Sequence, residues 1–239
     1  MKTGCLPKEK ESNGVEYIVL KRNYMKKVIV FGNNNIAQML YEDAKKRSPD
    51  FEICAFTVDE KYLDAEEFCG LPLVGFQDAV KRYPPSEYAM ISAVDAFRHM
   101  EDKIKVYERI KAEGYRVENY ISPLADVADS VTMGENNIVM AFAHLGVNGK
   151  MGNANMVRQS VYIGHDFNIG NGNTFSPGCT LGGFCEIEDY CYIALGATVL
   201  HKIKIERNAL AGAGAVVTKN IPAGITVVGN PARPHEKKE

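Results

Sequence analysis

An apolar residue returns at every sixth position over a long stretch of this chain, from residue 121 to about residue 222. A period of six fits neither an α-helix nor the alternation of a simple strand. It is the signature of a parallel β-helix, in which three hexapeptides make one triangular coil. An evenly spaced β-sandwich is the alternative, but an unbroken register argues against it. Ile121 starts the run, which continues through Val127, Met133, Val139, Leu145, Met151, Val157, Ile163, Ile169, Phe175, Leu181, Ile187, Ile193, Val199, Ile205, Ala211 and Val217.

Glycine often follows the repeated apolar residue, and asparagines are frequent between repeats. We predict that one apolar side chain per side points into the coil. The glycines and asparagines are expected at the corners, where a positive φ is often needed. The glycines that follow repeat residues are Gly134, Gly146, Gly152, Gly164, Gly170, Gly182 and Gly212.

The chain before the repeat alternates apolar strands with amphipathic helices. Strands are expected at 28–31, 51–57 and 88–92, and helices at 36–47, 76–82 and 97–112. This spacing predicts a small, Rossmann-like parallel α/β domain over residues 25–120. The β-helix then occupies 121–233, where Pro222 interrupts the repeat. Residues 1–24 are expected to be a loosely ordered extension, and 234–239 a charged tail.

Ligands of open parallel sheets bind at the carboxyl ends of the strands. Here those ends carry Asn33, Asn34 and Asn35, then Asp59, then Ala93. The turn beginning at Gly32 matches G-x-G-x-x-G poorly, which argues against NAD. A nucleotide or sugar that contacts amides and asparagine side chains remains open, as does a cap that binds nothing.

Composition excludes several classes of function. The net charge of −2 gives no reason to expect nucleic acid or an anionic membrane as a partner. No apolar run is long enough to span a bilayer, and no secretory leader is visible. Cys179, Cys185 and Cys191 lie six residues apart and so fall on three successive sides. We interpret them as small packing thiols of a cytoplasmic protein rather than as metal ligands.

Residues eighteen apart should stack on adjacent coils, about 4.8 Å apart. This spacing places His165, Gly183 and His201 in one column, with the histidines about 10 Å apart. His165 can act as a general base, and Asp166 can hold one of its ring nitrogens. The Gly183 N–H can stabilise an oxyanion. The combination favours acyl transfer, although a surface histidine without a role remains an alternative.

Zinc is the competing use of histidines on such a fold. The carbonic anhydrases built on a β-helix place two ligating histidines five residues apart, and the residue five after His165 is Gly170. His144 occupies a different position within its hexapeptide. We therefore expect no metal.

Four motifs resemble those of the hexapeptide-repeat acyltransferases: Ile163-Gly164-His165-Asp166, Leu181-Gly182-Gly183, the segment 211–217, and Gly229-Asn230-Pro231-Ala232. More narrowly, residues 26–233 resemble bacterial sugar acetyltransferases of surface-glycan synthesis, of the bacillosamine and perosamine N-acetyltransferase type and the sialic acid O-acetyltransferase type. The resemblance implies a left-handed β-helix, a homotrimer, and acetyl-CoA bound in a groove between protomers.

The same resemblance assigns roles to residues. His165 would be the general base, supported by Asp166 where relatives often have glutamate. Coenzyme contacts would fall on Thr174, Leu195, Ala213, Pro231 and Arg233, with Thr174 standing where some relatives have histidine. A nucleotide-sugar would contact Asn33, Asn34, Asn35, Asp59 and Ala93.

The expected function is therefore transfer of acetyl from acetyl-CoA to the amine of a nucleotide-linked 4-amino sugar. O-acetylation of a sugar hydroxyl, as in the sialic acid type, is the second reading. The third alternative is not an enzyme: a trimeric scaffold that binds a nucleotide-sugar without turning it over.

Overall fold

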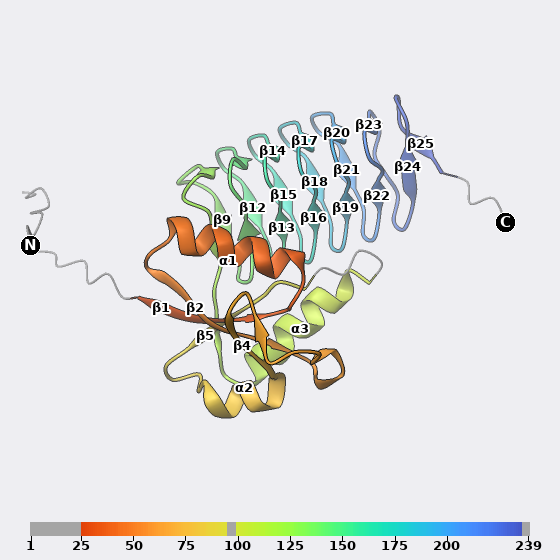
Figure 1. Ribbon diagram of the computed structural model, residues 1–239. Coiled ribbons are helices and arrows are strands. Elements are labelled where there is room, and N and C mark those ends of the chain that lie inside the picture. Colours follow the sequence, from red (N-terminus) through yellow and green to blue (C-terminus); the bar gives the residue numbers. More distant parts are fainter. Residues whose placement is uncertain (1–24, 95–98, 236–239) are drawn as a thin grey trace, which may run out of the picture.

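The computed structural model describes residues 25–94 and 99–235. It consists of an α/β part followed by a long prism of stacked coils, and the α/β part lies beside the first coils of the prism (Figure 1). The expected extension at 1–24 and residues 236–239 of the expected tail lie outside the described residues.

The α/β part is a six-stranded sheet whose central strands are parallel, which agrees with the predicted Rossmann-like arrangement. Strands β1 (Lys26–Phe31), β2 (Phe51–Val58) and β5 (Ala89–Ser92) correspond to the three expected strands within two residues. Helices α1 (Asn35–Arg47) and α2 (Phe76–Arg82) also lie where they were expected. The strand order is β3-β4-β2-β1-β5-β6.

Helix α3 begins later than predicted. It spans Glu101–Ala112, while the expected start at Phe97 lies outside the described residues. His99 and Met100 precede the helix, and its first turn carries Glu101 and Asp102. Acidic side chains are stabilising at that end of a helix, so the charge pattern marks the true start better than the apolar pattern does.

Four short elements were not predicted from the sequence, because segments of two to five residues carry little usable periodicity. Strands β3 and β4 form an antiparallel hairpin through Cys69 and Gly70, both of which have positive φ. The four elements are β3 (Glu67–Phe68), β4 (Leu71–Gly75), β6 (Arg116–Val117) and the 3₁₀ helix η1 (Glu60–Tyr62).

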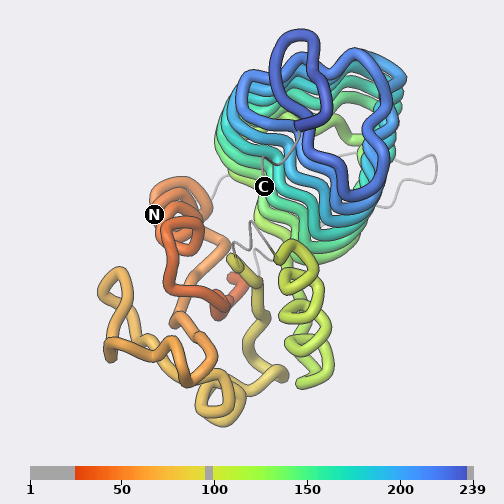
Figure 2. The backbone as a smooth tube through the Cα atoms, turned by 90° about the vertical axis from the view of Figure 1, so that its right-hand side faces the viewer, coloured from red at the N-terminus to blue at the C-terminus, as the bar shows by residue number. Residues whose placement is uncertain are grey.

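The period of six is confirmed as a left-handed β-helix with three flat sides. Each repeat contributes a two-residue strand whose second residue is the apolar repeat residue, and strands pair in parallel with partners eighteen residues away, such as Leu145 with Ile163. Figure 2 looks along the prism and shows the stacked, nearly triangular coils with the α/β part beside them.

We name the three sides by the order in which the chain visits them. The first face holds β7 (Tyr120–Ile121), β10 (Ile138–Val139), β13 (Met156–Val157), β16 (Thr174–Phe175), β19 (Tyr192–Ile193), β22 (Leu210–Ala211), β24 (Thr226–Val228) and the antiparallel β25 (Arg233–Pro234). The second face holds β8 (Asp126–Val127), β11 (His144–Leu145), β14 (Tyr162–Ile163), β17 (Thr180–Leu181), β20 (Thr198–Val199) and β23 (Val216–Val217). The third face holds β9 (Thr132–Met133), β12 (Lys150–Met151), β15 (Asn168–Ile169), β18 (Glu186–Ile187) and β21 (Lys204–Ile205).

The glycines after the repeat residues do not serve the corners as predicted. Gly146 takes an ordinary φ, and a Cβ there would lie 2.8 Å from the carbonyl carbon of Gly164 on the next coil. A Cβ on Gly164 or Gly182 would likewise meet backbone atoms of the next coil. A Cβ on Gly134, Gly152 or Gly170 would instead meet a side-chain oxygen of Asn153, Asn171 or Asp189. Positive φ occurs three residues after the repeat residue instead, at several asparagines, as predicted, and also at bulky residues such as Phe184.

The repeat residues fill the prism, and most are fully buried. The three clustered cysteines are free thiols buried among them, as expected of packing residues. Ile121 pairs in register with Val139 but remains 40% exposed, because it belongs to the first strand of its face and no coil lies beneath it.

The α/β part packs on the first face of the prism. One cluster of buried side chains joins α1 and the sheet to Ile138, Met140 and Met156 of that face. The buried Lys103 of α3 extends its Nζ to the carbonyl of Asn173 and the hydroxyl of Thr174, both at 2.9 Å. Within the described parts of the chain, no helix has the length and apolarity that a membrane span would require.

Candidate active site

His165 lies at the corner between the second and third faces, two residues after β14. Its side chain is 53% exposed, so a substrate can reach the ring. The Nδ1 atom lies 2.8 Å from Oδ2 of Asp166, the next residue in the chain. A carboxylate on Nδ1 fixes the tautomer in which Nδ1 carries the proton, and Nε2 is then left with its lone pair.

Asp166 is held in place from two sides. Its backbone has φ of 53°, and its other carboxylate oxygen accepts a hydrogen bond from Asn148 of the coil below. The hydrogen bond from His165, assisted by the one from Asn148, lowers the pKa of Asp166 below its ordinary value of 3.8. The carboxylate therefore stays ionised beside the imidazole at neutral pH. The short side chain of aspartate is therefore long enough to contact the imidazole at this corner.

Gly183 lies directly against the His165 ring, as the eighteen-residue column predicts. A Cβ built on Gly183 would be 2.7 Å from both Nε2 and Cε1 of His165. The backbone of Gly183 has no left-handed φ. The absent side chain is therefore required by the imidazole and not by the conformation of the chain.

The Gly183 N–H has no acceptor among the described residues. Its place in the column puts it beside the unprotonated Nε2, where a donor could meet developing negative charge. Phe184 stands perpendicular to the imidazole, with ring centroids 5.0 Å apart. Three neighbours, Asp166, Gly183 and Phe184, thus define the position of the ring. Phe184 was not anticipated, although its position beside Gly183 in the column could have suggested it.

The other histidines have different surroundings. His144 forms a second histidine–carboxylate pair with Asp126 at 2.8 Å, and its ring stacks on Tyr162 at 4.8 Å. Both partners lie eighteen residues away, so the column rule could have found them. In residues 25–94 and 99–235, no three side chains of the types His, Cys, Asp and Glu gather as metal ligands would.

The residues expected to contact the coenzyme fall in three places. Leu195 and Ala213 lie at the corner between the first and second faces, where Gly214 donates its N–H to the Leu195 carbonyl at 2.8 Å. Leu195 is 57% exposed. Pro231 and Arg233 belong to the turn and strand that end the prism. Thr174 is only 4% exposed, and its hydroxyl is engaged by Lys103, so it offers no open surface in this chain.

The residues expected to bind the nucleotide-sugar gather at the carboxyl edge of the α/β sheet. Asn34 caps α1 by accepting hydrogen bonds from the N–H groups of Ile36 and Ala37, and it donates to the carbonyl of Ala93 at 3.0 Å. Asn34 stands where the G-x-G-x-x-G pattern has its second glycine, and its side chain links the loop after β1 to the loop after β5. Asn33 donates weakly to the Tyr62 carbonyl at 3.4 Å, and Asn35 is exposed.

Asp59 follows β2 at the same edge and forms an ion pair with Arg109 of α3 at 2.5 Å. The guanidinium of Arg109 also lies 4.4 Å from the ring centroid of Phe76 and 5.2 Å from that of Phe31. The Asp59 carboxylate is thus held in position by Arg109, which neutralises part of its charge, and it can still accept a hydrogen bond. No feature of the sequence pointed to Arg109, because the ion pair joins residues fifty positions apart.

His165 and the carboxyl edge of the α/β sheet do not meet within one chain. The sheet packs on the first face, whereas His165 lies at the opposite corner, between the second and third faces. Apolar side chains are exposed near His165 and at the corner that carries Leu195. They are Val147, Phe184 and Leu200, and Leu124, Phe142 and Leu195. Exposed apolar side chains of this number indicate a contact surface.

Comparison with known proteins adds independent information, although no family model matches the chain. The GDP-perosamine N-acetyltransferase of Escherichia coli O157:H7 is 37% identical over 140 residues, which are 55% of this chain and 63% of that relative, less than two thirds of its length. The acetyltransferase domain of PglB from Neisseria gonorrhoeae, solved with acetyl coenzyme A, is 25% identical, with a TM-score of 0.78 over 88% of this chain and 99% of that domain.

A third structure agrees in fold. PerB from Caulobacter crescentus, solved with CoA and GDP-perosamine, is 21% identical and covers 89% of this chain and 98% of its own, with a TM-score of 0.78. The fold and the corner histidine define a β-helix protein with a Rossmann-like N-terminal part. The chain is similar in sequence and in fold to hexapeptide-repeat sugar acetyltransferases, in agreement with the resemblance of its motifs.

Proposed function

We propose that the protein transfers acetyl from acetyl-CoA to the amine of a nucleotide-linked amino sugar. The observation that carries the proposal is the His165 ring, whose Nδ1 is held by Asp166 while Nε2 lies open over Gly183. The acceptors and coenzyme of the similar proteins, GDP-perosamine and CoA, support this substrate class.

The chemistry follows from the two ring nitrogens. The acceptor nitrogen attacks the thioester carbonyl and forms a tetrahedral intermediate, while Nε2 of His165 takes the proton that the nitrogen loses. The Gly183 N–H stabilises the oxyanion. The carbon–sulfur bond then breaks, and the imidazolium returns its proton to the departing coenzyme A sulfur. Asp166 stabilises the imidazolium between these steps.

We propose further that the active unit is a homotrimer with each site between protomers. In one chain the catalytic corner and the sugar-binding edge lie on opposite sides of the prism, so a second copy must bring them together. The exposed apolar side chains around Leu195 and His165 would be covered in such an assembly. The coenzyme groove would lie along the same contact, with Leu195 and Ala213 on its wall.

Replacement of His165 by alanine tests the proposal. With UDP-, GDP- and dTDP-linked 4-amino sugars as acceptors, release of free thiol from acetyl-CoA should fall about 10²- to 10⁴-fold, the usual contribution of a general base. His201→Ala is the matched control, because it changes the same residue type in the same column, and it should retain wild-type turnover. Equal turnover of wild type and His165→Ala would remove His165 from the mechanism.

The same acceptor panel separates the remaining readings. Turnover with sugars that offer only hydroxyl groups would favour O-acetylation. Binding of a nucleotide-sugar without thiol release by the wild-type trimer would favour the non-catalytic scaffold.

A further inference from the structure

Asn148 contacts the catalytic pair of the proposed reaction from the coil below. It lies eighteen residues before Asp166 and so occupies the same position within its coil. Its amide Nδ2 donates a hydrogen bond to Oδ1 of Asp166 at 3.3 Å, while Oδ2 of the same carboxylate lies 2.8 Å from Nδ1 of His165. The three side chains therefore form a line of polar contacts that ends at the imidazole.

The backbone of Asn148 is held independently of this contact. Its N–H donates a hydrogen bond to Oγ of Ser130, one coil further down, at 2.9 Å. Its φ is 61°, a left-handed value that asparagine accepts more readily than most residues do. A residue that takes its place has to accept this φ and also carry an N–H donor.

Asp166 depends on a second contact because its side chain is 36% exposed. A carboxylate held at one oxygen can rotate, and the imidazole bonded to it can rotate with it. Contacts at both oxygens define the plane of the carboxylate and hence the direction of the ring. The other charged side chains around this corner are Asp129, Lys150 and Lys202, and none of them forms an ion pair with Asp166 in the described part of the chain.

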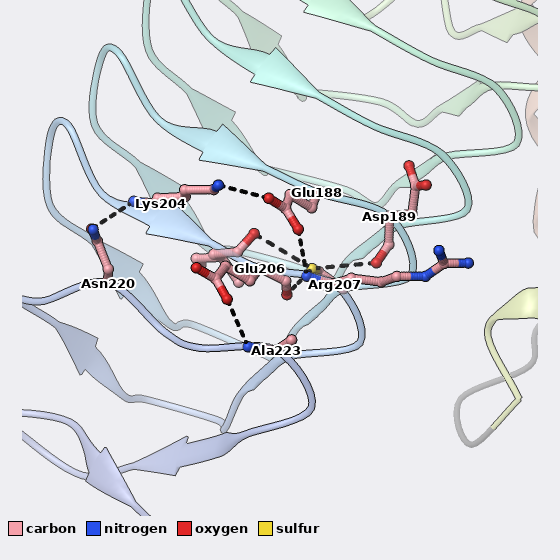
Figure 3. A network of polar contacts seen from close by, with 9 residues as sticks. Glu188, Asp189, Lys204, Glu206, Arg207, Asn220 and Ala223 are labelled. Carbon is pink, nitrogen blue, oxygen red and sulfur yellow. Dashed lines mark hydrogen bonds and ion pairs between the residues drawn. The ribbon is translucent and has the colours of Figure 1, made fainter.

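Other carboxylates on the prism join coils to one another without reaching an imidazole. Figure 3 shows such a network, in which Glu188 accepts from Nζ of Lys204 at 2.7 Å and from the backbone N–H of Arg207 at 3.1 Å. Both donors belong to the next coil, so this network serves the stacking of the coils. Asp166 instead joins Asn148 to the ring that the proposed function makes the general base.

We propose that Asn148 is a positioning residue for acyl transfer, because it orients the Asp166 carboxylate and, through it, Nε2 of His165 toward the acceptor amine. The inference rests on the proposed function, since it adds a residue to the same catalytic corner. Asn148 acts through Asp166 and does not bind either substrate. Its replacement should therefore lower kcat and leave KM for the amino sugar and for acetyl-CoA close to wild type.

Asn148→Gly is the main test, because glycine accepts the left-handed φ and removes only the side chain. We expect kcat for coenzyme A thiol release to fall about 3- to 10-fold, the usual contribution of one hydrogen bond. Since Asn148 is exposed, the melting temperature should stay close to wild type. Asn208→Gly is the matched control, because Asn208 is exposed, has φ of 58° and lies on a different corner. Wild-type kcat in Asn148→Gly, or an equal loss in the control, would overturn the proposal.

Asn148→Asp gives a readout that a structural contact alone would not change. Aspartate also tolerates this φ, but it places a second carboxylate against Asp166 where the amide was. Added negative charge favours the protonated imidazole, so the acidic limb of the kcat/KM profile should move to higher pH. An acidic limb at the wild-type pH would contradict a role that passes through Asp166.

A double variant separates this inference from the proposed function. Glycine also suits position 166, where φ is 53°, and Asn148→Gly should cause no further loss of kcat in the Asp166→Gly background. Additive losses would show that Asn148 acts by another route, and the proposed function would stand. Absence of thiol release by the wild-type protein with every nucleotide amino sugar would instead overturn the proposed function, and the role of Asn148 with it.

Discussion

Gly183→Ala is the change that most directly tests the geometry of the catalytic corner. The added Cβ would lie 2.7 Å from Nε2 and Cε1 of His165, whereas ordinary contact begins near 3.4 Å. The ring must therefore retreat by at least about 0.7 Å, away from the position set by Asp166 and Phe184. A displacement of about 1 Å in a catalytic group can cost about 10²-fold in rate, and we expect kcat to fall by that order.

The same substitution should leave the fold intact. The equivalent positions on other coils hold Val147, His165 and His201, so this corner accepts a Cβ elsewhere. The φ of Gly183 is not left-handed, and alanine keeps the N–H proposed to meet the oxyanion. The melting temperature and trimer mass should match wild type, which isolates the effect on the ring.

The assay is release of coenzyme A thiol with the best nucleotide amino sugar, for wild type, Gly183→Ala, His165→Ala and the double variant. Because the alanine acts only through the imidazole, the double variant should be no slower than His165→Ala alone. Wild-type kcat in Gly183→Ala would refute the contact, and additive losses in the double variant would show that Gly183 acts independently of His165.

Three further predictions concern the rest of the molecule. Asp166→Asn should lower kcat about 10- to 100-fold. Because the pKa of Asp166 lies below 3.8, the ratio of wild-type to variant kcat should stay constant from about pH 5 to pH 9. A ratio that falls to one at pH 5 would contradict an ionised carboxylate. Asn155→Ala removes an amide that donates to the Gly170 carbonyl and accepts from the Asn173 N–H, and should cost about 2–4 kcal/mol in urea unfolding, whereas Asn168→Ala, on the exposed side of β15, should be close to neutral. Burial raises the pKa of Cys179 and of Cys191 from 9.0 to about 12, so the folded state keeps protons that the unfolded chain loses. The free energy of unfolding should therefore keep its full value below pH 9 and decrease between about pH 9 and pH 12. The decrease should be smaller in the double variant Cys179→Ala/Cys191→Ala. An unchanged pH profile in that variant would show that these thiols do not contribute.

The sequence by itself determined the prism. A strict period of six leaves only a coil with three equal sides, and the same period fixes which residues stack, so the contact between His165 and Gly183 could be predicted without coordinates. The central strands of the α/β part were also predictable, because buried parallel strands are continuous apolar runs. The role of the glycines after the repeat residues was not predictable, since it depends on the distance between neighbouring coils and not on their own backbone conformation.

Only the tertiary structure decided what lies between the two parts of the chain. The ion pair of Arg109 with Asp59 and the burial of Thr174 beneath Lys103 both join residues that are distant in sequence and share no periodicity. Such contacts depend on how the sheet is oriented against the first face of the prism. That orientation is set by the packing of buried side chains from both parts, and it cannot be predicted from the local sequence pattern.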